Sequence, residues 1–515
     1  MLKKKKFAAL FLTMSLCAGI ISGCGGNNQT DQTPAAPASD TASKTAEVED
    51  SGTLDTSEEV ELVMYIISDR PAGQDVVDEN LNKLLKEKLN CTLKINWLGW
   101  AEYVNKYPLL FSSGEQFDIA YASSTWLNYV AMAQKGAFMN LDELWPKYAP
   151  ENYAATTETA KQLATVNGSY YCVPTQLATY SAFGMIYRED LVEGSDWDGV
   201  METYEDVEEY CDLVKELHPE MEPIDQYQTT PFWYYTYMGY EGQQYVDRNY
   251  HYMWFDPYEE NPHIITPWEY EGTMDFLKMM SRFSEKGFFS KSALSDTDSQ
   301  KLETGKAALR IHNVDSYSQI TALHPDWGVK YANFVKNVSH LPFTTDSMVI
   351  SNTSKNPERA MALWNLITTD QEVYDALMYG VEGVTYELNE SGQYMLLDTD
   401  LYSTSAMWAA RTNELNRNQA GTPEDYDTMR KEWDDAIVPG EGPERFAGFV
   451  FDPTNVISEI SACANVQQQY WWPLELGYVD TESGFAEYEA KMKAAGIEKV
   501  VEEAQRQLDE YLGVE

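Results

Sequence analysis

Strand and helix patterns alternate between residues 60 and 122 of this chain, and this alternation constrains its fold more than any other feature. Apolar or alternating runs at 60–67, 91–97 and 117–122 predict strands. The segments between them, 76–89 and 101–111, place their apolar residues on one face of a helix. Strands that alternate with helices form βαβ units with parallel strands. We therefore predict an α/β fold with a largely parallel sheet here.

The rest of the chain continues this pattern less regularly. Thr203-Tyr-Glu-Asp206 predicts a capping box before a helix, and two helices separated by Gly496 are expected at the C-terminal end. No later segment has the unbroken apolar length that a transmembrane helix needs. Further strands are predicted at 182–187, 307–311 and 330–335.

The first residues have the pattern of an export signal. Lys3 to Lys6 are followed by the apolar stretch Phe7–Ile21 and then by Ser22-Gly23-Cys24. This arrangement resembles the lipobox of a bacterial lipoprotein, in which Cys24 becomes the lipidated N-terminus after removal of residues 1–23. The resemblance implies a protein that is lipid-anchored on the extracytoplasmic face of the cell membrane. Residues 24–58 have almost no large apolar side chain and are expected to form a flexible linker.

Charge and composition exclude several kinds of partner and site. The formal net charge of −45 argues against binding to nucleic acid or to anionic lipid, both of which require basic patches. The six histidines show no metal-ligand spacing, and no phosphate-binding glycine loop or nucleophile elbow is present. We therefore expect no metal and no cofactor. Four cysteines lie outside the signal and lipobox, and they are expected to be buried apolar residues: Cys91, Cys172, Cys211 and Cys463. One disulfide between two of them is the alternative.

Several segments, in their order along the chain, resemble the extracellular solute-binding lipoproteins of bacterial ABC importers, in the family 1 (sugar-binding) group. The segment 355–361, with Asn356-Pro357-Glu358, matches the start of a family helix closely. Two further segments, 379–386 and 448–453, resemble a Gram-positive subgroup with a characteristic C-terminal domain. The Trp408–Arg411 segment lacks the glycine of that subgroup. The other similar segments are 113–122, 135–144, 168–174 and 186–191.

The resemblance implies a type II periplasmic-binding-protein-like fold, with two α/β lobes joined by hinge strands. Lobe 1 would comprise 59–178 and 343–395, and lobe 2 would comprise 179–342 and 396–515, including the C-terminal domain. The implied function is a monomeric, non-catalytic receptor that captures a carbohydrate, in particular an oligosaccharide, and delivers it to an ABC permease. The 67 Trp, Tyr and Phe residues suit a sugar-binding surface, although most of them are expected in the core.

The ligand should lie where strands end and helices begin. In the first lobe this predicts binding by hydroxyl, carboxylate, guanidinium and indole groups at Ser68, Asp69, Arg70, Trp97, Trp100, Ser123 and Trp126. In the second lobe the dense aromatic run around Trp233 and Tyr235 predicts a stacking platform, and the alternative is a helix-packed core. Asp315 and Tyr317 follow another strand, and the resemblance directs Glu382 towards the cleft.

Two other functions fit the same composition. A receptor of this fold could bind peptides or another small solute, and composition does not separate these from sugars. A surface glycoside hydrolase would also be acidic, aromatic and exported, and would require two carboxylates held across a cleft.

Overall fold

The computed structural model describes residues 54–514, except 100–102, 228–231, 400 and 403–405. The predicted signal peptide, Cys24, most of the linker and Trp100 therefore lie outside the described residues. Within the described part of the chain, no helix is both long and apolar enough to span a bilayer.

The first lobe is built on a five-stranded sheet in the order β2-β1-β3-β12-β6. Strands β1 (Val60–Ile67), β2 (Cys91–Leu98) and β3 (Ile119–Ala122) run parallel, which confirms the predicted βαβ pattern. Strand β12 (Ser347–Ile350) returns from far along the chain and pairs antiparallel with both β3 and β6 (Val173–Pro174). The local sequence pattern does not predict that β12 joins this sheet, because β12 lies far from the other strands along the chain.

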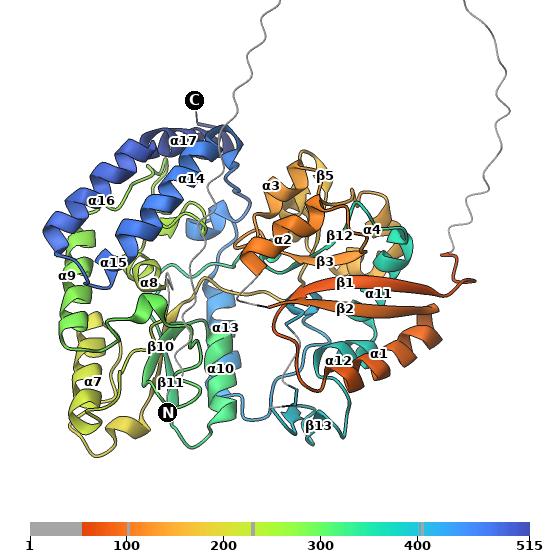
Figure 1. The fold of residues 1–515 in the computed structure, drawn as a ribbon, viewed down its shortest axis with the longest axis horizontal. Helices are drawn as coiled ribbons and strands as arrows, with labels where there is room; N and C mark the ends of the chain where they lie inside the picture. Colours follow the sequence, from red (N-terminus) through yellow and green to blue (C-terminus); the bar gives the residue numbers. More distant parts are fainter. Residues whose placement is uncertain (1–53, 100–102, 228–231, 400, 403–405, 515) are drawn as a thin grey trace, which may run out of the picture. The chain divides into compact units, whose positions relative to one another are not determined.

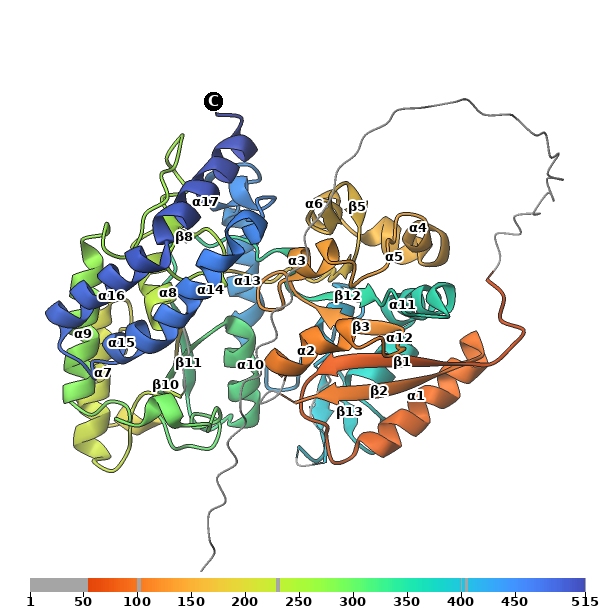
Figure 2. The ribbon, with the colours of Figure 1, turned by 45° about the horizontal axis from the view of Figure 1, so that its top comes forward.

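Helices cover this sheet and bury the apolar residues of its strands. Leu62 and Met64 of β1 are fully buried, and α1 (Gln74–Leu89) packs against β2 and beside α12 (Gln371–Met378) (Figures 1 and 2). The other elements of this lobe are α2 (Tyr103–Ser112), α3 (Tyr129–Gln134), α4 (Leu144–Tyr148), α5 (Pro150–Ala155), α6 (Glu158–Leu163), β4 (Thr165–Val166), β5 (Ser169–Tyr170), α11 (Pro357–Thr369), β13 (Tyr386–Leu388) and β14 (Tyr394–Leu396).

The second lobe contains a three-stranded sheet in the order β10-β7-β11. Strands β10 (Leu309–His312) and β11 (Val329–Asn333) are joined by α10 (Val314–Leu323), as in a βαβ unit. Strand β7 (Gly184–Arg188) lies between them and is antiparallel to both. The expectation of a largely parallel sheet therefore holds for β2-β1-β3 only, because here a strand from earlier in the chain is inserted between the two crossover strands.

Helices surround this second sheet. The predicted capping box is confirmed at Thr203 and Asp206, which begin α7 (Tyr204–Leu217). The other elements are α8 (Phe232–Tyr240), β8 (Gln244–Tyr245), β9 (Trp254–Phe255), α9 (Gly272–Glu285) and α13 (Glu424–Ala436).

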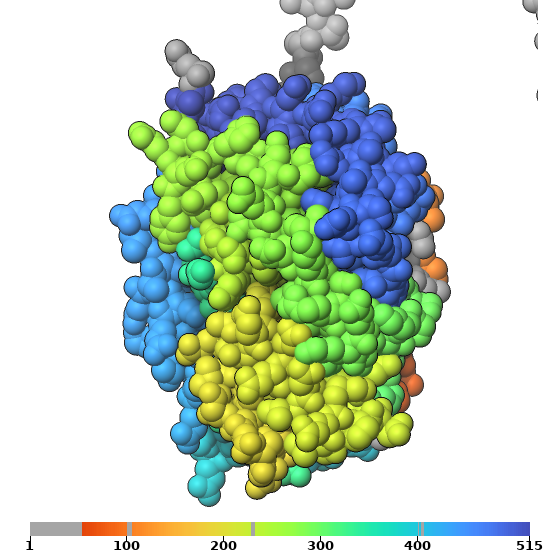
Figure 3. Space-filling view, turned by 90° about the vertical axis from the view of Figure 1, so that its left-hand side faces the viewer, coloured from red at the N-terminus to blue at the C-terminus, as the bar shows by residue number. Residues whose placement is uncertain are grey.

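The C-terminal helices share one core with the second lobe. Buried residues of α14 (Ile457–Val466), α15 (Trp472–Glu475), α16 (Thr481–Ala495) and α17 (Ile497–Leu512) pack with those of α8 and α9. Gly496 takes a left-handed conformation at φ 92°, which ends α16 and starts α17, as the break in the sequence pattern predicts. Figure 3 shows these blue C-terminal residues lying against the green residues of the same lobe.

Two chain segments that connect the cores run beside each other and form the hinge region. The Ser181 backbone N–H donates to Ser339 O at 2.8 Å, and the Ser339 backbone N–H donates to Ser181 Oγ at 2.9 Å. Nearer the first lobe, the Thr175 N–H donates to Asp346 O at 2.8 Å. These paired segments support the expected hinge, while the lobe boundaries stay predictions.

Candidate ligand-binding site

The carboxyl ends of β1 and β2 bring several predicted residues of the first lobe together. The Ser68 N–H donates to Leu98 O at 3.0 Å. The Asp69 carboxylate approaches the Gly99 backbone so closely that a Cβ at Gly99 would lie 2.6 Å from Asp69 Oδ1. Ser68 is half-buried and Asp69 is exposed. Both therefore lie at the sheet edge where ligands of α/β proteins bind.

Arg70 lies near this edge, but its guanidinium is directed to helix α1. It forms salt bridges with Asp75 and Asp78. Both contacts use Nη2, so one amino group of the guanidinium is held by α1.

The side chains of Trp97 and Ser123 pack within the first lobe. Trp97 is half-buried against the first core, and its Nε1 is buried with no hydrogen-bond partner among the described residues. The side chain of Ser123 is fully buried and accepts a hydrogen bond from the Thr125 N–H at 3.2 Å. Ser123 therefore shapes the turn after β3 and presents no open surface.

Trp126 is the centre of an aromatic group on the first lobe. Its ring centroid lies 5.5 Å from that of Tyr103 and 5.4 Å from that of Tyr121. Tyr121 also meets Trp408 edge to face at 6.2 Å. Trp126 and Trp408 are both half-buried, so each combines packing with an accessible edge or face. We name Tyr103, Tyr121, Trp126 and Trp408 the Trp126 cluster.

Of the aromatic run on α8, both predicted residues are nearly buried. Trp233 is 3% exposed, and its Nε1 donates to Gln226 Oε1 at 3.1 Å. Tyr235 is 5% exposed, and its hydroxyl donates to Ser181 O in the hinge region at 3.2 Å. Tyr235 also lines a cavity of about 20 Å³, room for one water molecule. Trp233 therefore has the surroundings expected of a residue in a helix-packed core, whereas Tyr235 contacts the hinge region.

Tyr317 and Glu382 lie in different surroundings from the residues above. Tyr317 is 2% exposed and donates to the Asp425 carboxylate at 3.0 Å, in a small core between α10 and α13. Glu382 is exposed in the turn between α12 and β13.

Asp315 belongs to a charged network at the junction of the lobes. Arg411 Nη1 lies 3.2 Å from Asp315 Oδ2, and Arg411 Nη2 lies 2.9 Å from Asp346 Oδ2. Tyr426 donates to Asp315 Oδ1 at 2.7 Å. Burial raises the pKa of Asp315, but the Arg411 and Arg430 guanidinium groups outweigh it and hold that pKa below its ordinary value. Asp315 is therefore ionised and tied to Arg411.

Sequence reasoning missed Arg248, a half-buried arginine of the second lobe. The Arg248 guanidinium carbon lies 4.6 Å from the ring centroid of Phe183, 5.5 Å from that of Tyr235 and 6.0 Å from that of Phe232. Arg248 forms no salt bridge with any residue that the structure describes, and it is only half-buried. We name Phe183, Phe232, Tyr235 and Arg248 the Arg248 cluster. Its guanidinium keeps donors for an outside acceptor.

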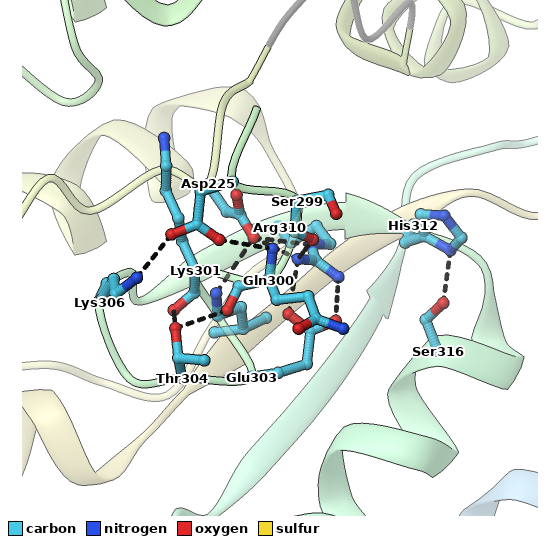
Figure 4. A network of polar contacts seen from close by, with 12 residues as sticks. Asp225, Ser299, Gln300, Lys301, Glu303, Thr304, Lys306, Arg310, His312 and Ser316 are labelled. Atoms are coloured by element: carbon cyan, nitrogen blue, oxygen red, sulfur yellow. Dashed lines mark hydrogen bonds and ion pairs between the residues drawn. The ribbon is translucent and has the colours of Figure 1, made fainter. Parts of the chain in front are cut away.

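His312 extends this cluster at the end of β10. Its ring centroid lies 5.3 Å from that of Phe232. Its Nδ1 lies 2.6 Å from Ser316 Oγ (Figure 4). Its Nε2 makes no hydrogen bond within the described part of the chain. Burial, together with Arg310 and Arg248, lowers the pKa of His312 to about 4. At neutral pH the imidazole is therefore uncharged, with one nitrogen open to a ligand.

Figure 4 also shows a network of polar contacts around β10 next to His312. Arg310, two residues earlier, donates from Nε to Asp225 Oδ2 at 2.9 Å and from Nη2 to Glu303 Oε2 at 2.7 Å. Lys301 donates to Gln226 O at 2.7 Å. This buried, charge-assisted network fixes the strand behind the Arg248 cluster.

One long hydrogen bond joins two segments that neighbour the clusters in sequence. Asn249, next to Arg248, donates from Nδ2 to the backbone oxygen of Ser124 at 3.5 Å. Ser124 lies two residues before Trp126. Asp247 holds the Asn249 side chain through a 2.7 Å hydrogen bond. The segments that carry Arg248 and Trp126 are therefore in contact, and their aromatic and polar groups are of the kind that suits a polar ligand with apolar faces.

Comparison with known proteins gives two family matches. A model described as bacterial extracellular solute-binding protein matches residues 70–374. A second model, described only as a domain of unknown function, matches residues 445–513.

Relatives and solved structures agree with the first match. A carbohydrate ABC transporter substrate-binding protein of Streptococcus pneumoniae serotype 4 is 30% identical over 472 residues, covering 89% of this chain and 92% of the relative. The N-glycan transport solute binding protein NgtS of Streptococcus pneumoniae, in complex with Man1GlcNAc, is similar at a TM-score of 0.74 and 27% identity, covering 88% of this chain and 100% of that one. The alginate-binding protein AlgQ2, at 15% identity and a TM-score of 0.63 over 88% of this chain and 99% of that one, shares the fold.

Proposed function

Because the chain belongs to the bacterial extracellular solute-binding protein family, we propose that it is the receptor of an ABC importer that captures an oligosaccharide between its lobes and delivers it to the permease. The name of the Streptococcus relative supports a carbohydrate ligand. Solved structures of NgtS hold Man1GlcNAc and Man5GlcNAc, which supports short mannose-containing glycans as the first ligands to test.

The observation that carries this proposal is the Asn249–Ser124 contact between the lobes. It joins the segment next to Arg248 to the segment next to Trp126, which supports a ligand site between the Arg248 cluster and the Trp126 cluster. A pyranose ring has an apolar face and a rim of hydroxyls, so a pair of aromatic surfaces with a few polar donors suits it.

Each group would have a distinct part in binding. Trp126 would stack on the apolar face of a sugar ring. Arg248 would donate its planar fork to two ligand oxygens, and the surrounding rings would hold that fork in one orientation. The neutral His312 would add one donor or acceptor through Nε2. Asp69 and Ser68 at the ends of the first-lobe strands complete the proposed set of hydroxyl-binding residues.

Closure of the two lobes would couple binding to transport. The paired hinge segments around Ser181 and Ser339 allow the lobes to rotate as bodies. A ligand that contacts both lobes only in the closed state shifts the population towards that state. The permease would then recognise the closed form, and no bond of the ligand is broken.

We further propose that a lipid on Cys24 anchors a monomer to the extracytoplasmic face of the membrane. The linker at 24–58 would let the folded part reach on the order of 30 Å from the membrane. Labelling cells with an alkyne-bearing palmitate analogue tests this: the wild-type chain should be labelled and the Cys24→Ala variant should not.

The ligand proposal is tested by calorimetric titration of residues 25–515 with mannose-containing oligosaccharides, other glycans of matched length, and di- and tripeptides. Binding of one glycan class, with the glycan recovered intact, supports the proposal. Binding of peptides alone would assign a peptide receptor, and release of new reducing ends would assign a hydrolase. Either result would overturn it.

A further inference from the structure

The domain of unknown function reaches the first lobe away from the hinge segments. Gln134, the last residue of α3, donates from Nε2 to Asp452 Oδ2 at 2.9 Å. The Thr454 hydroxyl lies 3.0 Å from Gln134 Oε1 and 2.5 Å from Asp452 Oδ1, so its one proton is shared between these two acceptors. One carboxamide thus uses both its donor and its acceptor on a single turn of the C-terminal domain.

A second approach lies a few residues earlier in that domain. A Cβ at Gly448 would lie 3.3 Å from Gln162 Nε2 on α6 of the first lobe and 3.2 Å from the Tyr511 hydroxyl of α17. Only a residue without a side chain leaves both groups where they are. Helices α3 and α6 of the first lobe therefore both meet the segment 448–454, and we name these contacts the seam.

The C-terminal helix holds its half of the seam in place. Gln507 of α17 accepts from the Asp452 N–H at 2.8 Å and donates to Asp452 O at 2.8 Å. Glu503 of the same helix accepts from Asn455 Nδ2 at 3.0 Å. The opposite face of α17 is buried in the second core through Ile497, Val500, Ala504 and Leu508. The turn at 452–455 is therefore a rigid projection of the second lobe.

The charge state of the seam suits hydrogen bonding to an amide. Burial raises the pKa of Asp452, but hydrogen bonds from Thr454 and Gln134 outweigh burial and hold that pKa below its ordinary value. The acceptor is thus a carboxylate at neutral pH. Gln134, Gln162 and Thr454 are exposed, so these bonds compete with water and are individually weak. Weak contacts of this kind form and break readily.

We propose that the C-terminal domain, residues 445–513, is the second-lobe half of a latch that favours lobe closure through the seam. The hinge segments hold the lobes together in every state, whereas the seam exists only while α3 and α6 lie against 448–454. The inference rests on the hinge motion of the proposed function, but it does not depend on what the ligand is. It gives the C-terminal domain a role in the balance between open and closed forms.

Pulsed electron spin resonance distances without ligand test the latch. Spin labels would be attached to cysteines introduced at Glu87 on α1 and Glu209 on α7, both exposed, in residues 25–515. The native cysteines among the described residues are buried and free, so labelling is directed to the new sites. The wild-type protein should show a population at the short distance of the contacting lobes.

Gln134→Ala removes both hydrogen bonds and should raise the ratio of long to short distances about fivefold. Gln134→Glu sets two carboxylates against each other and should raise it further, and Gly448→Ala should raise it less by displacing Gln162. The matched control is Gln505→Ala on α17, because Gln505 bonds Pro262 and Ile264 within its own lobe. This control should leave the ratio unchanged.

An unchanged ratio in Gln134→Ala and Gln134→Glu would overturn the latch, and so would a wild-type protein with no short-distance population. Thermal unfolding of each variant verifies that it is folded, which is expected because Gln134 is exposed. Since no ligand is used, a failed glycan titration would leave this result standing, and a failed latch would leave the ligand proposal standing.

Discussion

Arg411 Nη1 lies 3.2 Å from Asp315 Oδ2, and the same guanidinium also pairs with Asp346, which precedes strand β12. Asp315 lies in the first turn of α10 of the second lobe, so one arginine joins a second-lobe helix to a hinge segment. Asp346 in turn accepts from the buried hydroxyl of Tyr121, in the Trp126 cluster. The charged network therefore links the hinge to α10 of the second lobe and to the Trp126 cluster.

Removing Arg411 should destabilise the protein strongly. Arg411→Met leaves two poorly exposed carboxylates, Asp315 and Asp346, without their common cation. Breaking a buried ion pair from one side lowers the free energy of unfolding by about 3 kcal/mol. Urea unfolding measures this, with Arg506→Met as the control, since Arg506 pairs on the surface with Glu503 and Glu510. An equal effect of both substitutions would contradict the central place of Arg411.

Glu475 should make stability fall as the pH rises. This carboxyl is 1% exposed and accepts from the Trp471 indole, and burial raises its pKa to about 8. In the unfolded chain its pKa is near 4.3. Between these values the folded protein holds a proton that the unfolded chain has released, so the free energy of unfolding decreases with rising pH.

The Glu475→Gln variant separates this group from all others. It keeps an acceptor for Trp471 and cannot ionise, so its unfolding midpoint should fall less than that of the wild type between pH 5 and pH 8. The difference between the two proteins should grow to about 3 kcal/mol at pH 8. Parallel curves for the two proteins over this range would show that Glu475 is not the titrating group.

Arg248 should be the strongest polar contributor to binding. Arg248→Met removes the guanidinium fork and should weaken glycan binding about 100-fold, because hydrogen bonds to a charged group contribute about 1.5–3 kcal/mol each. Arg248→Lys keeps the charge but loses the planar fork and should recover little of the affinity. Arg282→Met on the surface is the control, and titration calorimetry is the measurement. Full recovery with lysine would mean that charge alone matters.

The first lobe was predictable from sequence because its information is local. The run at Val60–Ile67 is largely apolar and the run at Cys91–Leu98 alternates apolar with polar residues, and both are local signals of strands. The antiparallel insertion of β7 between β10 and β11 was not predictable, since it depends on pairing between residues more than 100 positions apart.

Part of the proposed site could be predicted because some of its residues follow a local sequence pattern. Ser68 and Asp69 follow from the end of a recognisable strand. Arg248 does not, because its partners Phe183 and Phe232 come from other elements and its neighbours in sequence carry no pattern. Arg70 matched the pattern of a ligand-binding residue, but Asp75 and Asp78 on the next helix turn bind its guanidinium.

Trp126 and Trp233 should respond to substitution in opposite ways, although both are tryptophans in aromatic surroundings. Trp126 is half-buried at the proposed site, so Trp126→Ala should lower glycan affinity at least tenfold with a modest loss of stability. Trp233 is 3% exposed in the second core, so Trp233→Ala should lower the free energy of unfolding by about 3–5 kcal/mol. Affinity measured on the folded fraction of Trp233→Ala should stay close to that of the wild type. If instead Trp233→Ala abolished binding in a fully folded protein while Trp126→Ala bound normally, the ligand would contact Trp233 itself and the Trp126 cluster would be packing only.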